Sequence, residues 1–182
     1  GVISGTPTAA GVVSISLSAS NGVGSDAKTL VVTVRARPAI TSSLVASGVV
    51  GQAFSYTVTS SGSAPISLSA TGLPAWASFN AGVISGTPTA DGSFSITLGA
   101  SNVAGSDSQT LVLTVRSVPA ITSGLAVDAI VGDAFSYTLT STGTAPVTLS
   151  ATSLPAWASF NAGVISGTPT TDGVVSISLG AT

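Results

Sequence analysis

The sequence predicts an all-β chain of tandem antiparallel β-sandwich domains, and three observations lead to this prediction. A block of 81 residues recurs, and residues 1–101 placed on residues 82–182 give 71 identities in 101 positions. Within short segments, apolar residues alternate with Ser and Thr at a period of two. Gly, Pro, Asn and Asp separate these segments, and none shows the apolar stripe of a helix. A period of 81 residues is too long for a solenoid coil and fits one small domain per repeat.

Residues 38–118 contain one full set of the expected strands. Phe54, Tyr56 and Val58 alternate with hydroxyl residues, as in a strand with one buried face. Six of the expected strands lie near residues 40–41, 54–59, 66–70, 83–85, 94–100 and 111–115. About seven short strands with an apolar inner face and a hydroxyl outer face indicate a sandwich of immunoglobulin-like type.

Proline marks the expected domain boundaries. A β-rich run ends before Pro38 and again before Pro119, and proline interrupts a strand ladder because it lacks an N–H group. We therefore expect residues 1–37 to be the C-terminal part of one domain. Residues 38–118 should form a complete domain, and residues 119–182 a domain without its last strand.

The repeated motifs resemble those of a known family. The segment Leu-Pro, then Gly-Val-Ile-Ser-Gly-Thr-Pro about nine residues later, then Ala-Ser-Asn and Gly-Ser-Asp, is similar to the immunoglobulin-like He-PIG repeats and close to dystroglycan-type cadherin-like repeats. The resemblance covers essentially the whole chain. It implies a β-sandwich module that large bacterial surface and secreted proteins use in tandem, often without catalytic activity, and it specifies no ligand.

Composition removes most catalytic chemistry. The chain has no His, Cys or Met and no Glu, only 5% charged residues, and a net charge of −2. Serine triads, cysteine dyads and zinc centres are therefore excluded, and we assign no catalytic, cofactor-binding or metal-binding residue. Four scattered basic residues give no footprint for nucleic acid. No apolar stretch is long enough for a transmembrane helix, and 56 Ser and Thr residues supply an uncharged polar surface that suits an extracellular or cell-surface protein.

Two patterns that suggest ligands have simpler structural readings. The glycine-rich segment 82–88 lacks the lysine and helix that a phosphate loop requires, so we expect a strand and a turn. Calcium needs clustered oxygen ligands, but the acids are dispersed and the junctions carry Arg35, Arg37 and Arg116. Weak calcium binding at Asp26 or Asp107 stays open, and an Asx turn is the favoured role.

The two tryptophans could be sugar-stacking platforms or core residues. Trp76 and Trp157 each lie in Leu-Pro-Ala-Trp-Ala-Ser-Phe, without the acids or amides that flank most sugar platforms. Burial between two sheets is a common role for Trp in sandwiches, and we favour it.

These observations favour a non-catalytic structural segment of a bacterial extracellular fibre, stalk or adhesin. The alternative is a carbohydrate- or ligand-binding module of a secreted or surface protein, with a surface glycan or host ligand as partner. Neighbouring copies of the repeat should join head to tail in a semi-rigid rod. The final domain should have a core groove and an unpaired edge, which covalent continuation or strand donation between chains would complete. Because residues 1–20 duplicate residues 163–182, we expect covalent continuation.

Overall fold

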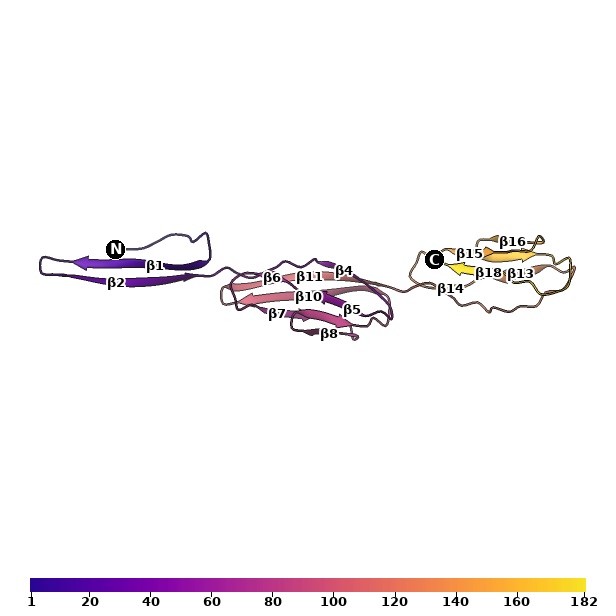
Figure 1. Ribbon diagram of the computed structural model, residues 1–182, viewed down its shortest axis with the longest axis horizontal. Helices are drawn as coiled ribbons and strands as arrows, with labels where there is room; N and C mark the ends of the chain where they lie inside the picture. Colours follow the sequence, from indigo (N-terminus) through magenta and orange to yellow (C-terminus); the bar gives the residue numbers. More distant parts are fainter. The chain divides into compact units, whose positions relative to one another are not determined.

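The computed structural model describes all residues, 1–182, and is built from strands (Figure 1). Residues 1–37 contribute a hairpin of β1 (Gly11–Ser20) and β2 (Ser25–Val34). The strands pair antiparallel over all ten residues, from Gly11 with Val34 to Ser20 with Ser25. This N-terminal hairpin therefore has no sheet of its own beyond its two strands.

Residues 38–118, the middle repeat, form a sandwich of two sheets. One sheet has the order β4-β11-β10-β7 and the other β5-β9-β8, with a short β3-β6 pair beside them. The strands of the middle repeat are β3 (Ala39–Ile40), β4 (Val45–Val49), β5 (Phe54–Thr57), β6 (Ser60–Ser61), β7 (Ser67–Thr71), β8 (Ala77–Asn80), β9 (Val83–Gly86), β10 (Gly92–Asn102) and β11 (Gly105–Arg116). The predicted class, tandem immunoglobulin-like sandwiches of 81-residue period, is confirmed.

Residues 119–182, the last repeat, have the same strands with two exceptions. The strands are β12 (Ala120–Ile121), β13 (Phe135–Thr138), β14 (Ser141–Thr142), β15 (Leu149–Thr152), β16 (Ala158–Asn161), β17 (Val164–Gly167) and β18 (Ser178–Ala181). The sheets are β13-β17-β16, β15-β18 and β12-β14. No strand corresponds to β4 or to β11, and β18 covers only four residues of the segment that corresponds to β10.

The core lies between the two sheets of the middle repeat. Nine of the eleven buried hydrophobic residues belong to this repeat, and Leu139 and Ile165 belong to the last one. The fully buried side chains come mainly from the two long strands, with Ile96 and Leu98 on β10 and Leu111 and Leu113 on β11. The alternation in the sequence thus becomes the inner face of the four-stranded sheet.

The middle repeat has nine strands where the sequence pattern indicates about seven. Segment 45–49 was not predicted as a strand, and it becomes β4 because it pairs with β11. Segment 77–80 was also not predicted, and it forms a hairpin with β9. The predicted strand 54–59 is shorter in the structure, because β5 ends at Thr57 and the short β6 begins at Ser60.

A two-residue turn connects β8 and β9. Asn80 pairs with Val83, which leaves Ala81 and Gly82 in the loop with φ angles of 48° and 82°. Two consecutive left-handed residues form the type I′ turn that fits the twist of a hairpin. Ala162 and Gly163 repeat this geometry with φ angles of 48° and 81°.

We predict that Ala81→Gly stabilises the middle repeat. A non-glycine residue in the left-handed region costs roughly 1–2 kcal/mol, and the added flexibility of the unfolded chain returns about 0.4–1 kcal/mol of that. The net gain should be about 0.5–1 kcal/mol in denaturant unfolding. Ala77→Gly, in the adjacent strand, should instead destabilise the repeat, and equal effects at both positions would contradict the prediction.

Candidate functional site

Trp76 lies in a cluster of aromatic rings. Its ring makes edge-to-face contacts with Phe54 (centroid distance 5.9 Å) and Phe94 (6.1 Å). Its indole nitrogen is buried without a hydrogen-bond partner, while the residue as a whole is half-buried. Because the indole ring of Trp76 packs against two other aromatic rings, this geometry supports a core role for Trp76 over a role as a sugar platform.

Glycine-rich segment 82–88 contributes strand β9 and supports this tryptophan. A Cβ atom at Gly86 would lie 2.1 Å from the carbonyl oxygen of Trp76 and 3.0 Å from its ring. The last repeat has the same approach, because a Cβ atom at Gly167 would lie 2.0 Å from the carbonyl oxygen of Trp157. The glycine motif therefore allows close packing of the β8–β9 hairpin against the tryptophan.

Asp107 has a structural role within the middle repeat. The backbone N–H of Ile40 donates to its Oδ2 at 2.8 Å, and Gln109 Nε2 donates to its Oδ1 at 3.2 Å. The Ile40 N–H holds the pKa of Asp107 below its usual value, partial desolvation opposes this shift, and Gln109 adds to it. Asp26, at the equivalent position of the hairpin, is exposed and lies 3.6 Å from Lys28 Nζ.

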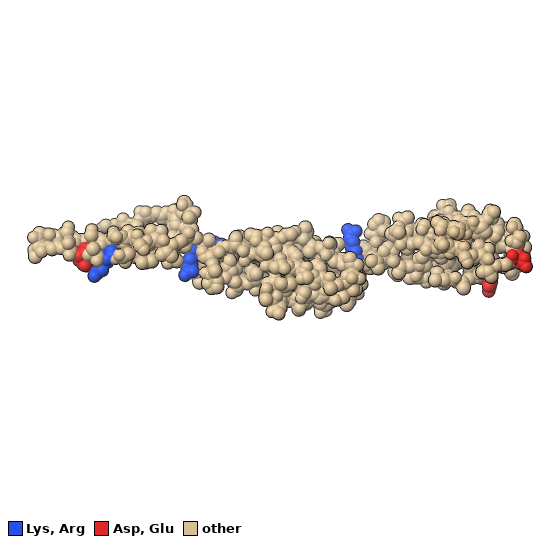
Figure 2. Space-filling view, viewed as in Figure 1, with Lys and Arg blue, Asp and Glu red and all other residues tan.

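The structure brings together no group of three or more acidic, His or Cys residues that could hold a metal ion. Charged side chains are sparse on the face shown in Figure 2. No helix is long and apolar enough to cross a membrane.

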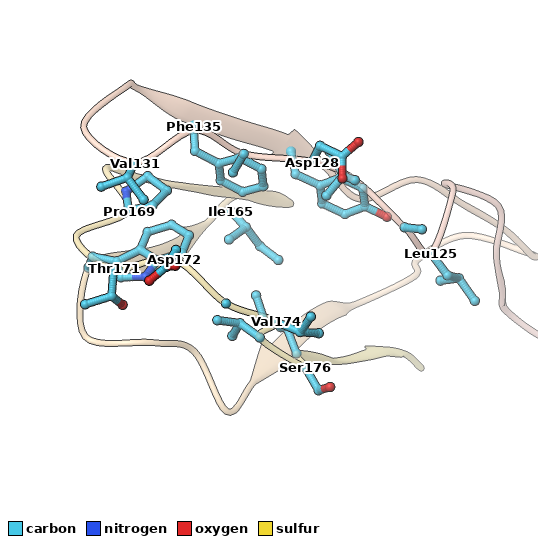
Figure 3. Close-up of a pocket in the computed structure, with 18 of the residues that line it drawn as sticks. Leu125, Asp128, Val131, Phe135, Ile165, Pro169, Thr171, Asp172, Val174 and Ser176 are labelled. Atoms are coloured by element: carbon cyan, nitrogen blue, oxygen red, sulfur yellow. The ribbon is translucent and has the colours of Figure 1, made fainter.

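The last repeat contains an apolar groove of about 660 Å³ (Figure 3). Phe135 and Ile165 point into it from one side, and Val174 lies on the segment opposite. The middle repeat shows what normally fills this space: Leu111, Leu113 and Val115 of β11 are 0%, 0% and 1% exposed there.

Residues that lose this packing are more exposed in the last repeat. Ile177 and Leu179 are half-buried, whereas their counterparts Ile96 and Leu98 are fully buried. The sequence analysis predicts this groove and the unpaired edge, because no counterpart of β11 is present in residues 119–182. The sequence pattern did not indicate that the loop 124–131 would line the groove, because that loop forms a strand in the middle repeat only beside β11.

Comparisons with known proteins agree with the fold. A sequence model described as "Putative Ig domain" (He_PIG) matches residues 37–116 and 118–182. Three Ig domains of titin superpose with a TM-score of 0.62 at 17% identity, over 91% of this chain and 71% of that one. Extracellular domains 3–5 of Drosophila OTK give 0.55 at 10% identity, over 79% of this chain and 60% of that one.

A Bacteroides fragilis protein described as a "putative alpha-galactosidase" matches at 29% identity with a TM-score of 0.42, over 44% of this chain. This chain spans 18% of the length of that protein. No curated protein sequence matches the chain significantly.

We predict that Trp76→Ala destabilises the middle repeat by about 3–5 kcal/mol, because it removes a large aromatic group and leaves a cavity. Val103→Ala, at a side chain that is 75% exposed, should change stability by less than about 0.5 kcal/mol. Denaturant unfolding measures both. If Trp76→Ala unfolded like the parent chain and lost binding to a polysaccharide, the sugar-platform role would be correct.

A second prediction concerns acid stability. The lowered pKa of Asp107 means that its carboxylate stabilises the fold above the unfolded pKa of about 3.9, and that this contribution is lost as the pH falls through the folded pKa. Asp107→Asn should therefore lower the melting temperature of the middle repeat at pH 7, with the difference shrinking below about pH 4. Asp26→Asn is the matched control and should have no effect, and a pH-independent difference for Asp107→Asn would contradict the prediction.

Proposed function

Because the chain belongs to the family described as "Putative Ig domain", we propose that it is a non-catalytic structural segment of a bacterial extracellular fibre, stalk or adhesin. The observation that carries the proposal is the repetition itself, with 71 identities in 101 aligned positions. A recognition domain is expected to differ from the spacers beside it, whereas a structural array repeats one stable unit. Immunoglobulin-like domains of this kind are found in extracellular proteins.

The strand arrangement of the middle repeat supports a role under tension. Val112 N–H donates to Leu44 O, and Val50 N–H donates to Arg116 O, both at 2.9 Å. Going from the first hydrogen bond to the second, the residue numbers rise on both segments, from Leu44 to Val50 and from Val112 to Arg116. β4 and β11 are therefore parallel neighbours, and they lie near the two sequence ends of the repeat. Pulling the ends apart would load these hydrogen bonds together in shear, so that they resist force collectively.

The alternative function, a carbohydrate- or ligand-binding module, has less support. Trp76 is engaged by two aromatic rings and is not presented as an open platform.

We predict that the middle repeat unfolds in one step under force and lengthens the chain by roughly 250 Å, at about 3.3–3.6 Å per extended residue. Val50→Pro removes the N–H that donates to Arg116 O and should lower the unfolding force. Val50→Ala keeps that N–H and is the matched control. Single-molecule pulling measures both, and equal forces for the two variants would contradict the shear arrangement.

The extracellular location has its own test. Protease treatment of intact cells that produce the parent protein should release peptides from this chain. Release only after cell lysis would overturn the assignment to an extracellular fibre, stalk or adhesin.

A further inference from the structure

The turn between β1 and β2 places an asparagine directly before a glycine. Strand pairing ends at Ser20 and Ser25, so Asn21 and Gly22 lie in the loop, and both residues are exposed. Gly22 has no side chain, and open space surrounds the position that a Cβ atom would take there. The backbone nitrogen of Gly22 can therefore approach the side chain of Asn21 without steric hindrance.

Two backbone N–H groups of this turn hold the side-chain carbonyl of Asn21. Val23 N–H donates to Asn21 Oδ1 at 2.9 Å, and Gly24 N–H donates to the same oxygen at 3.0 Å. N–H groups aimed at an oxygen stabilise the negative charge that develops on it during nucleophilic attack. The turn therefore prepares Cγ of Asn21 for attack by the adjacent backbone nitrogen.

We propose that Asn21 and Gly22 form a site of spontaneous modification, at which Asn21 becomes aspartate or isoaspartate. The deprotonated amide nitrogen of Gly22 bonds to Cγ of Asn21, and the bond from Cγ to Nδ2 breaks. Nδ2 takes up protons and leaves as ammonia, and a cyclic succinimide remains. Water then adds to either ring carbonyl and opens the ring, so water is the only reagent consumed. This inference does not depend on the proposed extracellular function.

The middle repeat contains the same turn in a protected form. Asn102 is the counterpart of Asn21, and Ala104 N–H donates to its Oδ1 at 2.8 Å. Val103 stands in place of Gly22, and its branched side chain crowds the nitrogen that would attack. Val103 is 75% exposed, so exposure of this position is a property of the turn in a complete repeat. The residue after the asparagine is therefore the difference that sets the rate of ring closure.

The modification removes an anchor of the linker. In the middle repeat, Asn102 Nδ2 donates to Ala36 O at 2.8 Å and to Ser63 O at 2.9 Å. An ionised aspartate at this position has no donor, and it places a negative charge beside two carbonyl oxygens. The linker should therefore loosen wherever the asparagine of this turn is converted.

The first experiment incubates the full chain in a mildly alkaline buffer and follows each asparagine by mass spectrometry of its peptides. We expect Asn21 to convert while Asn102 stays an amide, with isoaspartate detected by enzymatic methylation. Gly22→Val should slow the conversion of Asn21 at least about tenfold, because the side chain obstructs the attack. Val23→Ala keeps the N–H that donates to Oδ1 and is the matched control, with the rate of the parent chain. Equal rates at Asn21 and Asn102, or an unchanged rate in Gly22→Val, would overturn the proposal.

The second experiment measures the effect on the linker with Asn102→Asp, which places one of the two products in the middle repeat. Hydrogen exchange at the N–H groups of Ala36 and Ser63 should become faster, because these groups form the bonds between linker and repeat. Exchange in β11 should stay slow. Asn80→Asp adds the same charge at an exposed position and is the matched control. Unchanged exchange at Ala36 and Ser63, or faster exchange throughout the repeat, would refute a local release of the linker.

Discussion

The packing of β11 against the opposite sheet is the constraint on which the rest of each repeat depends. Where β11 is present, the neighbouring segment 45–49 becomes β4 and the facing residues Ile96 and Leu98 are fully buried. In the last repeat, which has no counterpart of β11, the equivalent loop forms no strand and the facing residues are half-buried. One strand thus decides whether a second strand forms and whether the core closes, as expected where non-local pairing supplies most of the burial.

A second, smaller unit is complete in both repeats. The β8–β9 hairpin, its type I′ turn and the close approach of Gly86 to Trp76 recur at Gly167 and Trp157. The contact of Phe54 with Trp76 also recurs, as Phe135 with Trp157 at 5.8 Å. This unit keeps its geometry with or without β11, because its hydrogen bonds and its Phe–Trp contact join residues in or next to the three-stranded sheet. The contact of Trp76 with Phe94, on β10 of the other sheet, does not recur, since Val175 takes the place of Phe94. The motif that is most similar between repeats is therefore the part that needs least from its surroundings.

The fold class could be predicted from the sequence because it rests on two signals that need no knowledge of the tertiary structure, the local alternation of apolar residues and the 81-residue period. The alternation of Phe54, Tyr56 and Val58 reports a half-buried strand directly, and the 81-residue offset shows which positions are equivalent. The sequence was not sufficient for β4, whose Ser and Gly residues interrupt the alternation and whose pairing is set by β11. The position of the groove could be predicted from the 81-residue period, but its lining residues could not. The lining depends on the conformation of loop 124–131, which has no counterpart of β11 to pair with.

The linker residue two positions before each boundary proline, Ala36 or Ser117, makes hydrogen bonds that the local sequence pattern does not predict. Ala36 N–H donates to Ser63 Oγ at 2.9 Å, and Ser63 N–H donates back to Ala36 O at 3.2 Å. Asn102 Nδ2 donates to Ala36 O and to Ser63 O, at 2.8 and 2.9 Å. Ser117 and Thr144 form the equivalent pair of hydrogen bonds in the last repeat: Ser117 N–H donates to Thr144 Oγ1, and Thr144 N–H donates to Ser117 O.

These hydrogen bonds attach the linker to the repeat that follows it. A fragment cut at Pro38 would lose the three bonds that involve Ala36 and leave the amide of Asn102 with one acceptor, Ser63 O, in place of two. The smallest piece that folds with all of its polar groups satisfied should therefore start at or before Ala36, two residues upstream of the proline that marks the sequence boundary. For the same reason, a protease should cut more readily on the N-terminal side of Ala36 than between Ala36 and Pro38.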